Sequence, residues 1–412
     1  MTGRSNRPSK WISCQLGARE HYAIPRAVLR DGRLQLLVTD AWAPPGSLCA
    51  RLPGGVGRRI RERFVAELHG AHVRSFTASL IAHEASWRMR GLAGWELVVT
   101  RNEWFQRRAA NEVRLAPVEP GATTVVFAHS YAARAQFQAA KARGFVTILG
   151  QIDPGEGHFQ TVERLAREWP DYGAVPERPP AGYFESWREE CALADRIVVN
   201  SEWSGDALAR AGIPPSKVTV VPLPFEPESV SSGFSRDYPE AFTASRPLRV
   251  LCVGSATVAK GVPPLLEALD RSEGLPIELT LVGEQAMVIP PRYRAHPSIQ
   301  WVGPVSRSDV MTHYRQSDVL VFPSFSDGFG MAQIEAQGWR LPVIASRSCG
   351  RVVEDGVNGL LLDDVSPATI ASALRKVTAD PRILAGFSRN AGSIRPAGLS
   401  PLGAALHALE PA

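Results

Sequence analysis

With 412 residues, the chain is too long for one ordinary hydrophobic core, and we expect two domains of about 200 residues each. Apolar residues make up 44% of the sequence and charged residues 21%, a balance that excludes a disordered protein. The formal net charge of +5 is not accompanied by zinc-finger, RNP or P-loop spacing, so nucleic acid is the weaker choice of partner.

Cysteine usage and the lack of long apolar segments predict a cytoplasmic protein. No CxxC pair occurs, which argues against a zinc site or a disulfide framework and favours a reducing compartment. The charged N-terminus does not resemble a signal peptide, and no apolar run approaches the roughly 20 residues of a spanning helix. The basic residues Arg58, Arg59, Arg61 and Arg63 form a solvated helix face or, alternatively, contact anionic substrate or lipid headgroups at the inner membrane face.

The first half of the chain reads as strands separated by helical patterns. The expected strands are 11–16, 33–40, 123–130, 145–149, 196–200 and 217–222. Residues 1–222 then form one domain. Residues 223–247 are rich in Pro, Ser and Gly without periodicity and are interpreted as a linker.

The second half is more regular and predicts a second domain over 248–390, with a tail at 391–412. The expected strands are 248–253, 277–282, 299–302, 318–322, 341–345 and 359–362, and the expected helices are 262–269, 306–316, a helix from about Gly330 through Gly338, and 367–377. Near-continuous apolar strands that alternate with helices predict an α/β fold with parallel sheets. In such sheets ligands bind outside the carboxyl ends of the strands.

The segment after the strand 318–322 carries the strongest signal for a site. Gly328 and Gly330 allow a ligand to approach the backbone, and the helix that begins near Gly330 presents free N–H groups suited to phosphate. Glu335 lies on that helix and suits a diol such as ribose, while Asp327 precedes the helix and suits a sugar hydroxyl. The alternatives are a surface glutamate and an ordinary helix-capping aspartate, but the apolar neighbours of Glu335 indicate a buried helix, in which a glutamate needs a partner.

A second loop, at residues 254–261, places Lys260 at the mouth of the helix 262–269. A lysine there can neutralise a diphosphate leaving group without a metal. The signal is weak alone, because a lysine before a helix is common. It gains weight because the loop lies at the same sheet edge as Asp327.

These segments resemble retaining glycosyltransferases of family 4, which have the GT-B fold of two Rossmann-like domains facing a central cleft. The resemblance rests on VGSATVAKG (253–261), LVG (281–283), WVGPV (301–305), PSFSDGFGMAQIEAQGWRLPVIAS (323–346) and, at the end of the first domain, residues 201–223. It covers 195–390 well and the first 190 residues poorly. The family has two glutamates separated by seven residues; here Asp327 and Glu335 keep the spacing with a shortened first acid.

The resemblance assigns roles to the residues that match. Glu335 would bind ribose, Lys260 the diphosphate, and the backbone near Val305 the base. The residues that would hold the donor sugar are Asp327 and the backbone of Gly328, Phe329, Gly330 and Met331, and Gly254 and Ser255 belong to the same nucleotide-sugar site. The family has an arginine where Ser255 stands, and Arg19 and Arg347 are candidates to replace it.

The first domain contributes two further matches to the family. A histidine that touches the donor sugar is best matched by His129, which ends the expected strand 123–130, and His158 is its rival. The alternative for His129 is a strand-end residue without a role. Gly17 resembles the family's glycine-rich loop, although the usual second glycine is missing.

The resemblance implies a hexosyltransferase-like enzyme that moves a sugar from a nucleotide sugar, such as a UDP- or GDP-sugar, to a glycan or lipid-linked acceptor hydroxyl with retention of configuration. Such an enzyme would need neither metal nor cofactor and would serve bacterial polysaccharide or glycolipid synthesis. Ser255 and Asp327 favour a rival, a sugar-nucleotide-binding protein without catalysis. Another GT-B enzyme, such as a sugar-nucleotide epimerase, is a second alternative, and a nicotinamide enzyme is disfavoured because no GxGxxG follows a strand.

Overall fold

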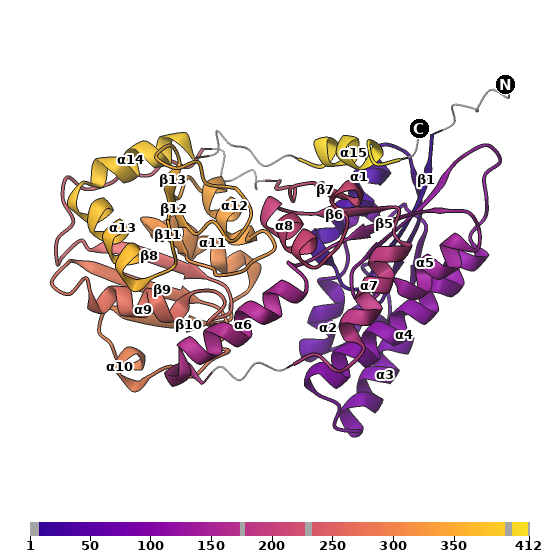
Figure 1. Ribbon diagram of the computed structural model, residues 1–412, viewed down its shortest axis with the longest axis horizontal. Helices are drawn as coiled ribbons and strands as arrows, with labels where there is room; N and C mark the ends of the chain where they lie inside the picture. Colours follow the sequence, from indigo (N-terminus) through magenta and orange to yellow (C-terminus); the bar gives the residue numbers. More distant parts are fainter. Residues whose placement is uncertain (1–7, 174–177, 227–232, 392–397, 411–412) are drawn as a thin grey trace.

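The computed structural model describes residues 8–173, 178–226, 233–391 and 398–410 of the chain. Within them the chain forms two domains side by side, each a parallel sheet flanked by helices (Figure 1). The first half of the chain builds most of one domain and the second half most of the other. The expected α/β fold with two Rossmann-like parallel-sheet domains is confirmed.

The N-terminal domain holds a seven-stranded sheet, counted over the described residues, in the order β3-β2-β1-β4-β5-β6-β7. Its strands are β1 (Lys10–Gln15), β2 (Leu34–Thr39), β3 (Val73–Ser75), β4 (Thr124–His129), β5 (Val146–Gly150), β6 (Arg196–Val199) and β7 (Val218–Val220). The sequence predicted all of these except β3, a three-residue edge strand whose first residue is only partly buried. Strands alternate with helices because parallel neighbours need a crossover connection.

The helices of this domain are α1 (Ala23–Arg30), α2 (Gly54–Arg61), α3 (Thr77–Met89), α4 (Gly94–Leu115), α5 (Arg134–Lys141), α6 (Glu156–Glu168), α7 (Tyr183–Leu193) and α8 (Glu202–Arg210). The main core lies between the sheet and α4, α5 and α7, and includes Phe105, Phe137 and Trp187. No helix in the described part of the chain is both long enough and apolar enough to span a membrane.

The C-terminal domain holds a six-stranded sheet, again over the described residues, in the order β10-β9-β8-β11-β12-β13. Its strands are β8 (Leu248–Val253), β9 (Ile277–Val282), β10 (Ile299–Gly303), β11 (Val319–Phe322), β12 (Val343–Ala345) and β13 (Gly359–Leu361), and its helices are α9 (Val262–Asp270), α10 (Pro291–Arg294), α11 (Arg307–Gln316), α12 (Met331–Gly338), α13 (Pro367–Ala379) and α14 (Pro381–Asn390). All six strands lie where the sequence predicted them. The side chains of Ser306 and Ser366 cap α11 and α13 as expected.

Two segments pack against the opposite domain from the one that is built by their half of the chain. The last helix, α15 (Leu399–His407), lies on the N-terminal domain beside α1 and buries Leu402 and Leu406 there (Figure 1). Conversely, α6 and the following turn bury Leu165 and Tyr172 in the core of the C-terminal domain. Both ends of α6 are therefore crossings between the domains.

The segment interpreted as a linker, 223–247, contacts both domains, its residues 227–232 lying outside the described residues. Glu226 forms ion pairs with Arg26 at 2.5 Å and with Arg30 at 3.0 Å, both on α1 of the N-terminal domain. Leu223 and Phe225 pack against the cluster that contains Phe329, which lies near the end of the loop between β11 and α12. Further along, the guanidinium of Arg246 forms an ion pair with Asp318 at 2.7 Å. The tail 391–412 is described only for 391 and 398–410.

Candidate functional site

The loop between β11 and α12 and the loop between β8 and α9 meet at one edge of the C-terminal sheet. Lys260 Nζ forms an ion pair with Asp327 Oδ2, and the second carboxylate oxygen accepts a hydrogen bond from Phe329 N at 3.2 Å. A side chain at Gly261 would place a Cβ 1.9 Å from Pro323 O, so only glycine allows this approach. The two residues that the sequence placed on this sheet edge are therefore in direct contact.

Glu335 projects from α12 and is held by a neighbouring helix. Its Oε2 accepts a hydrogen bond from the hydroxyl of Tyr314 on α11, at 2.8 Å. Its helical neighbours Ile334 and Ala336 are fully buried, and Glu335 itself is only partly buried. The expected buried helix and the expected partner for its carboxylate are both present, and Tyr314 could not be predicted as that partner because it lies on a different helix.

The remaining predicted residues of this wall line the same sheet edge. Gly254 and Ser255 are exposed, in a loop that runs beside the loop after β9 through the bond from Ala256 N to Glu284 O at 2.7 Å. Val305 is partly buried and precedes α11. Gly330 ends the loop with φ of 84° before Met331 begins α12.

Two arginines were candidates to replace the family arginine at Ser255. Arg347 is exposed in the segment that braces the site loop, through the bond from Asp327 N to Ser348 O, and its guanidinium lies 3.8 Å from Asp363. Arg19 is exposed in the N-terminal domain. Neither makes a hydrogen bond or ion pair with Lys260 or Asp327 within the described residues.

The N-terminal domain touches this site through the ends of β5 and β6 and through α6. Ser201 Oγ donates a hydrogen bond to Gly328 O at 2.5 Å, and a Cβ at Gly328 would lie 2.8 Å from Ile152 O. His158 Nδ1 lies 3.1 Å from Ser326 Oγ. The two walls of the cleft therefore meet beside Asp327.

Of the two predicted histidines, His158 is the one that contacts the loop carrying Asp327, through Ser326. Burial lowers the pKa of His158, while the negative charges of Asp153 and Asp327 raise it and the cation of Lys260 lowers it. These influences place His158 among the charged groups of both domains. In the sequence analysis, His158 is only the rival of His129 for the histidine that touches the donor sugar, and Asp153 is not a predicted site residue.

His129 lies in a different place, deep in the N-terminal domain. It lines a cavity of about 20 Å³, which also borders Glu20, Asn200 and Leu402 and is large enough for about one water molecule. Neither ring nitrogen of His129 makes a hydrogen bond of ordinary geometry to the described residues. Burial, together with the nearby cation of Arg19, lowers the pKa of His129 to about 3.

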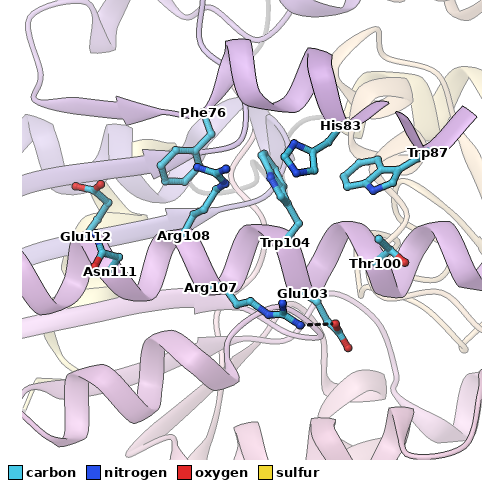
Figure 2. Close-up of a pocket in the computed structure, with 10 residues that line it drawn as sticks. All are labelled: Phe76, His83, Trp87, Thr100, Glu103, Trp104, Arg107, Arg108, Asn111 and Glu112. Carbon is cyan, nitrogen blue, oxygen red and sulfur yellow. Dashed lines mark hydrogen bonds and ion pairs between the residues drawn. The ribbon is translucent and has the colours of Figure 1, made fainter. Parts of the chain in front are cut away.

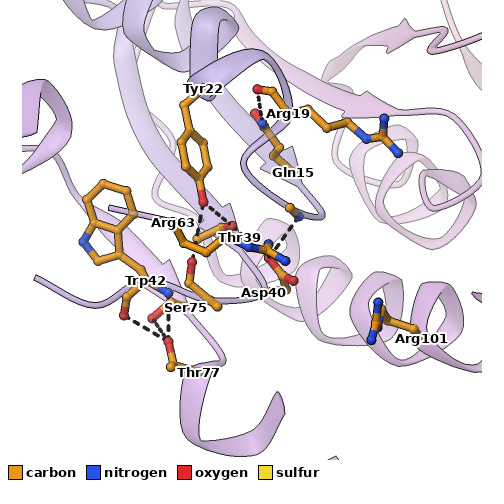
Figure 3. A network of polar contacts seen from close by, with 12 residues as sticks. Gln15, Arg19, Tyr22, Thr39, Asp40, Trp42, Arg63, Ser75, Thr77 and Arg101 are labelled. Atoms are coloured by element: carbon orange, nitrogen blue, oxygen red, sulfur yellow. Dashed lines mark hydrogen bonds and ion pairs between the residues drawn. The ribbon is translucent and has the colours of Figure 1, made fainter. Parts of the chain in front are cut away.

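Gly17 follows β1 and has φ of 84°. Its N–H donates a hydrogen bond to Asp40 Oδ1 at 3.0 Å, and Arg63 Nη1 donates to the same oxygen at 2.7 Å (Figure 3). Asp40 is almost fully buried, so this ion pair neutralises its charge. No hydrogen bond or ion pair connects Gly17 to the C-terminal wall within the described residues.

A separate cavity of about 570 Å³ lies between α3 and α4, entirely within the N-terminal domain (Figure 2). Its walls combine aromatic rings with charged groups, including Trp87, Trp104, Glu103 and Arg107, and Glu103 pairs with Arg107 at 3.0 Å. None of the predicted site residues lines it. The site is therefore assigned to the cleft, where the residues from both domains converge, and not to the larger cavity.

Over the described residues, no three histidine, cysteine, aspartate or glutamate side chains gather as a metal site requires. All five cysteines are free thiols: Cys14, Cys49, Cys191, Cys252 and Cys349.

Known proteins match the C-terminal domain in sequence and nearly the whole chain in fold. Residues 247–380 match the family model described as Glycosyl transferases group 1. The chain is 28% identical over 303 residues to a D-inositol 3-phosphate glycosyltransferase of Geodermatophilus obscurus, covering 67% of this chain and 64% of the relative. It is 30% identical over 233 residues to the protein of the same name from Streptomyces bingchenggensis, covering 52% of this chain and 51% of the relative. The chain thus spans between one half and two thirds of these relatives.

Solved structures share the architecture over nearly the whole chain. HepE of Anabaena, in complex with UDP-glucose, superposes with a TM-score of 0.62 at 16% identity and covers 97% of this chain and 99% of its own. The sucrose-phosphate synthase of Thermosynechococcus elongatus gives a TM-score of 0.61 at 16% identity, covering 97% of this chain and 98% of its own. The protein therefore has the GT-B fold.

Proposed function

We propose that the protein is a glycosyltransferase that moves a sugar from a nucleotide diphosphate sugar to an acceptor hydroxyl. The observation that carries this proposal is the convergence of Lys260, Asp327 and the start of α12 at one sheet edge, with Glu335 one turn further on. The group 1 match over the same residues and the UDP-glucose held by HepE support it.

In the proposed donor complex, Glu335 accepts hydrogen bonds from the ribose hydroxyls while Tyr314 keeps its carboxylate in place. Lys260 exchanges Asp327 for the diphosphate, whose charge also benefits from the free N–H groups at the start of α12. Asp327, released from Lys260, accepts a hydroxyl of the donor sugar. Stabilisation of the departing phosphate is the largest contribution that Lys260 makes to the rate.

We further propose that configuration is retained and that the departing phosphate takes the acceptor proton on the same face of the sugar. Since Lys260 neutralises the diphosphate, transfer should persist in a chelator such as EDTA. The acceptor is a phosphorylated cyclitol or a glycan, in line with the D-inositol 3-phosphate that names the relatives. A role in polysaccharide or glycolipid synthesis in the cytoplasm, with peripheral membrane contact through the exposed Arg58 and Arg61, completes the proposal.

The experiment is a thermal-shift screen of the full chain against UDP-, GDP- and ADP-sugars, followed by an assay of nucleotide release with D-inositol 3-phosphate as acceptor. A stabilising nucleotide sugar and acceptor-dependent release of the nucleoside diphosphate are the expected results. Glu335→Ala should reduce transfer at least tenfold, a loss of ~1.4 kcal/mol of transition-state binding. Full activity in Glu335→Ala and Lys260→Ala together would refute the site assignment.

The second candidate is a nucleotide-sugar-binding protein without catalysis. Ser255 favours it, because the diphosphate would lack the arginine of the related enzymes. Stabilisation by a nucleotide sugar without nucleotide release, over a panel of inositol phosphates and oligosaccharides, would support this candidate. Conversion of the bound sugar to its epimer, followed by NMR, would instead reveal an epimerase.

A further inference from the structure

The turn that follows β5 holds one carboxylate in a fixed orientation. Asp153 Oδ1 accepts three hydrogen bonds: from the Tyr131 hydroxyl at 2.7 Å, from Gly155 N at 2.8 Å and from Gln151 Nε2 at 3.1 Å. Gln151 is itself held by Trp187, whose Nε1 donates to Gln151 Oε1 at 2.9 Å. A chain of buried groups therefore fixes the plane of this carboxylate.

The second oxygen of the same carboxylate, Oδ2, makes no hydrogen bond to the described residues, and it is not among their buried polar atoms without a partner, so it is open to solvent. One oxygen is thus saturated by three donors while the other is left for an external donor. This asymmetry is typical of a preorganised binding group.

The position of Asp153 is in the cleft, between the two walls. Its neighbour Ile152 lies against Gly328 of the donor loop, and the charge of Asp153 acts on His158, which contacts Ser326. The carboxyl end of β5 is where a ligand of this domain is expected. Asp153 therefore faces the region in which donor and acceptor would meet.

Backbone strain supports a role for this turn beyond stability. Tyr131 has φ of 71°, a left-handed conformation that costs a non-glycine residue free energy, and it is held there by stacking on Tyr183 at a ring separation of 5.0 Å. This strained conformation positions the Tyr131 hydroxyl, which donates a hydrogen bond to Asp153. Strained residues that orient a functional group are common at active sites.

We propose that Asp153 is a catalytic residue whose Oδ2 accepts a hydrogen bond from an acceptor hydroxyl next to the one that is glycosylated, and so orients the reacting oxygen. This inference rests on the proposed transferase function and adds a residue that contacts the acceptor. The acceptor is a polyol hydroxyl, since a carboxylate binds hydroxyl donors and repels the phosphate of an anionic acceptor from that point.

The step balances as follows. The bond between the anomeric carbon and the phosphate oxygen breaks, and its electron pair goes to the departing phosphate. A new bond forms between the acceptor oxygen and the anomeric carbon. The hydroxyl proton goes to the departing phosphate, which leaves as the nucleoside diphosphate. Asp153 keeps its charge throughout, orients the acceptor oxygen and favours the positive charge that develops at the sugar.

The test is Asp153→Asn in the full chain, with UDP-glucose as donor and D-inositol 3-phosphate as acceptor, or the donor and acceptor identified by the screen above. The asparagine oxygen can keep the three donors of Oδ1, and its amide replaces only Oδ2. We expect kcat to fall at least 50-fold and the KM for acceptor to rise, while the dissociation constant for the donor stays within twofold.

The matched control is Glu156→Gln, which removes a carboxylate three positions along the chain that pairs with Arg188 on the surface. It should leave kcat within twofold. Tyr131→Phe removes one of the three donors that orient Asp153, and we expect an intermediate loss of three- to tenfold in kcat with unchanged donor binding.

An Asp153→Asn variant that transfers at the wild-type rate would overturn the inference and leave the proposed function standing. If the wild type binds no nucleotide sugar, the proposed function itself has failed, which donor binding reveals before any variant is made. Should Asp153→Asn not fold, Asp153→Glu tests the same point: a displaced carboxylate should fold and lose transfer, and wild-type kcat in that variant would reject the role.

Discussion

The two walls of the cleft are built in different ways. The C-terminal wall comes from two strand–loop–helix units: Lys260 follows β8, and Asp327 and Glu335 follow β11. In the N-terminal wall, Asp153 and His158 follow β5 and Ser201 follows β6, but the orientation of Asp153 depends on the distant residues Tyr131 and Trp187. Site residues that lie close together in the chain can be predicted from the sequence, whereas residues that only tertiary packing brings together cannot.

The same contrast extends to the movement of the domains. Helix α6, which carries His158, belongs to the first half of the chain but buries Leu165 in the core of the C-terminal domain. Helix α15 belongs to the second half of the chain but buries Leu406 in the N-terminal domain. Closure of the cleft would therefore involve four crossings of the chain: the two ends of α6, the linker and the segment before α15. The predictions below test this division between the walls.

The largest expected effect concerns α15. Leu406 is fully buried against the N-terminal domain, so Leu406→Ala should lower the free energy of unfolding by ~3 kcal/mol through lost burial and a residual cavity. Urea denaturation followed by tryptophan fluorescence measures the loss. The exposed Ser400 on the same helix is the control, and Ser400→Ala should change stability by less than ~0.5 kcal/mol. An equally small effect of Leu406→Ala would mean that α15 does not stabilise the N-terminal domain.

Lys260→Ala tests the C-terminal wall. Removal of the cation that faces the departing diphosphate should reduce kcat by about 10²-fold, because preorganised charge at a leaving group is a major part of catalysis. The assay is release of nucleoside diphosphate at saturating donor. Lys376→Ala, which removes an exposed lysine of the same domain, should leave kcat unchanged. If both variants keep wild-type kcat, the leaving-group site lies elsewhere.

A pair of histidine variants separates the walls further. His158→Ala should reduce kcat/KM about tenfold, since His158 contacts the donor loop through Ser326 and lies among the charges of Asp153 and Asp327. His129→Ala should change it by less than twofold, because His129 lies in a separate cavity of the N-terminal domain. The reverse order of effects would restore His129 as the histidine that touches the donor sugar.

The same difference explains which strands and site residues can be predicted from the sequence. Strand β8 is predicted to the residue, because an apolar run ends at a glycine and a helix start follows. Strand β3 is missed, because three residues with little burial leave no pattern. Asp153 is missed for another reason: its significance comes from Tyr131 and Trp187, which only tertiary packing brings to it.

The smallest expected effect is the pH dependence of stability that arises from His129, and it tests whether this histidine matters to the N-terminal domain rather than to the cleft. Burial lowers the pKa of His129 to about 3, so in the folded protein the ring stays neutral while in the unfolded chain it titrates near its ordinary value of 6.5. Between these two values the unfolded state binds more protons, and the stability of the wild type must fall as the pH is lowered below 6.5.

His129→Gln removes the pH-dependent contribution of His129 to the free energy of unfolding. The free energy of unfolding of the wild type should fall by ~1 kcal/mol more than that of the variant between pH 6.5 and pH 5.5, because one proton per molecule corresponds to ~1.4 kcal/mol per pH unit. Above pH 7 the two proteins should show parallel stability curves. Parallel curves down to pH 5.5 as well would mean that His129 is protonated in the folded state, and the cavity beside Glu20 would then have to stabilise an imidazolium that the present geometry leaves without a partner.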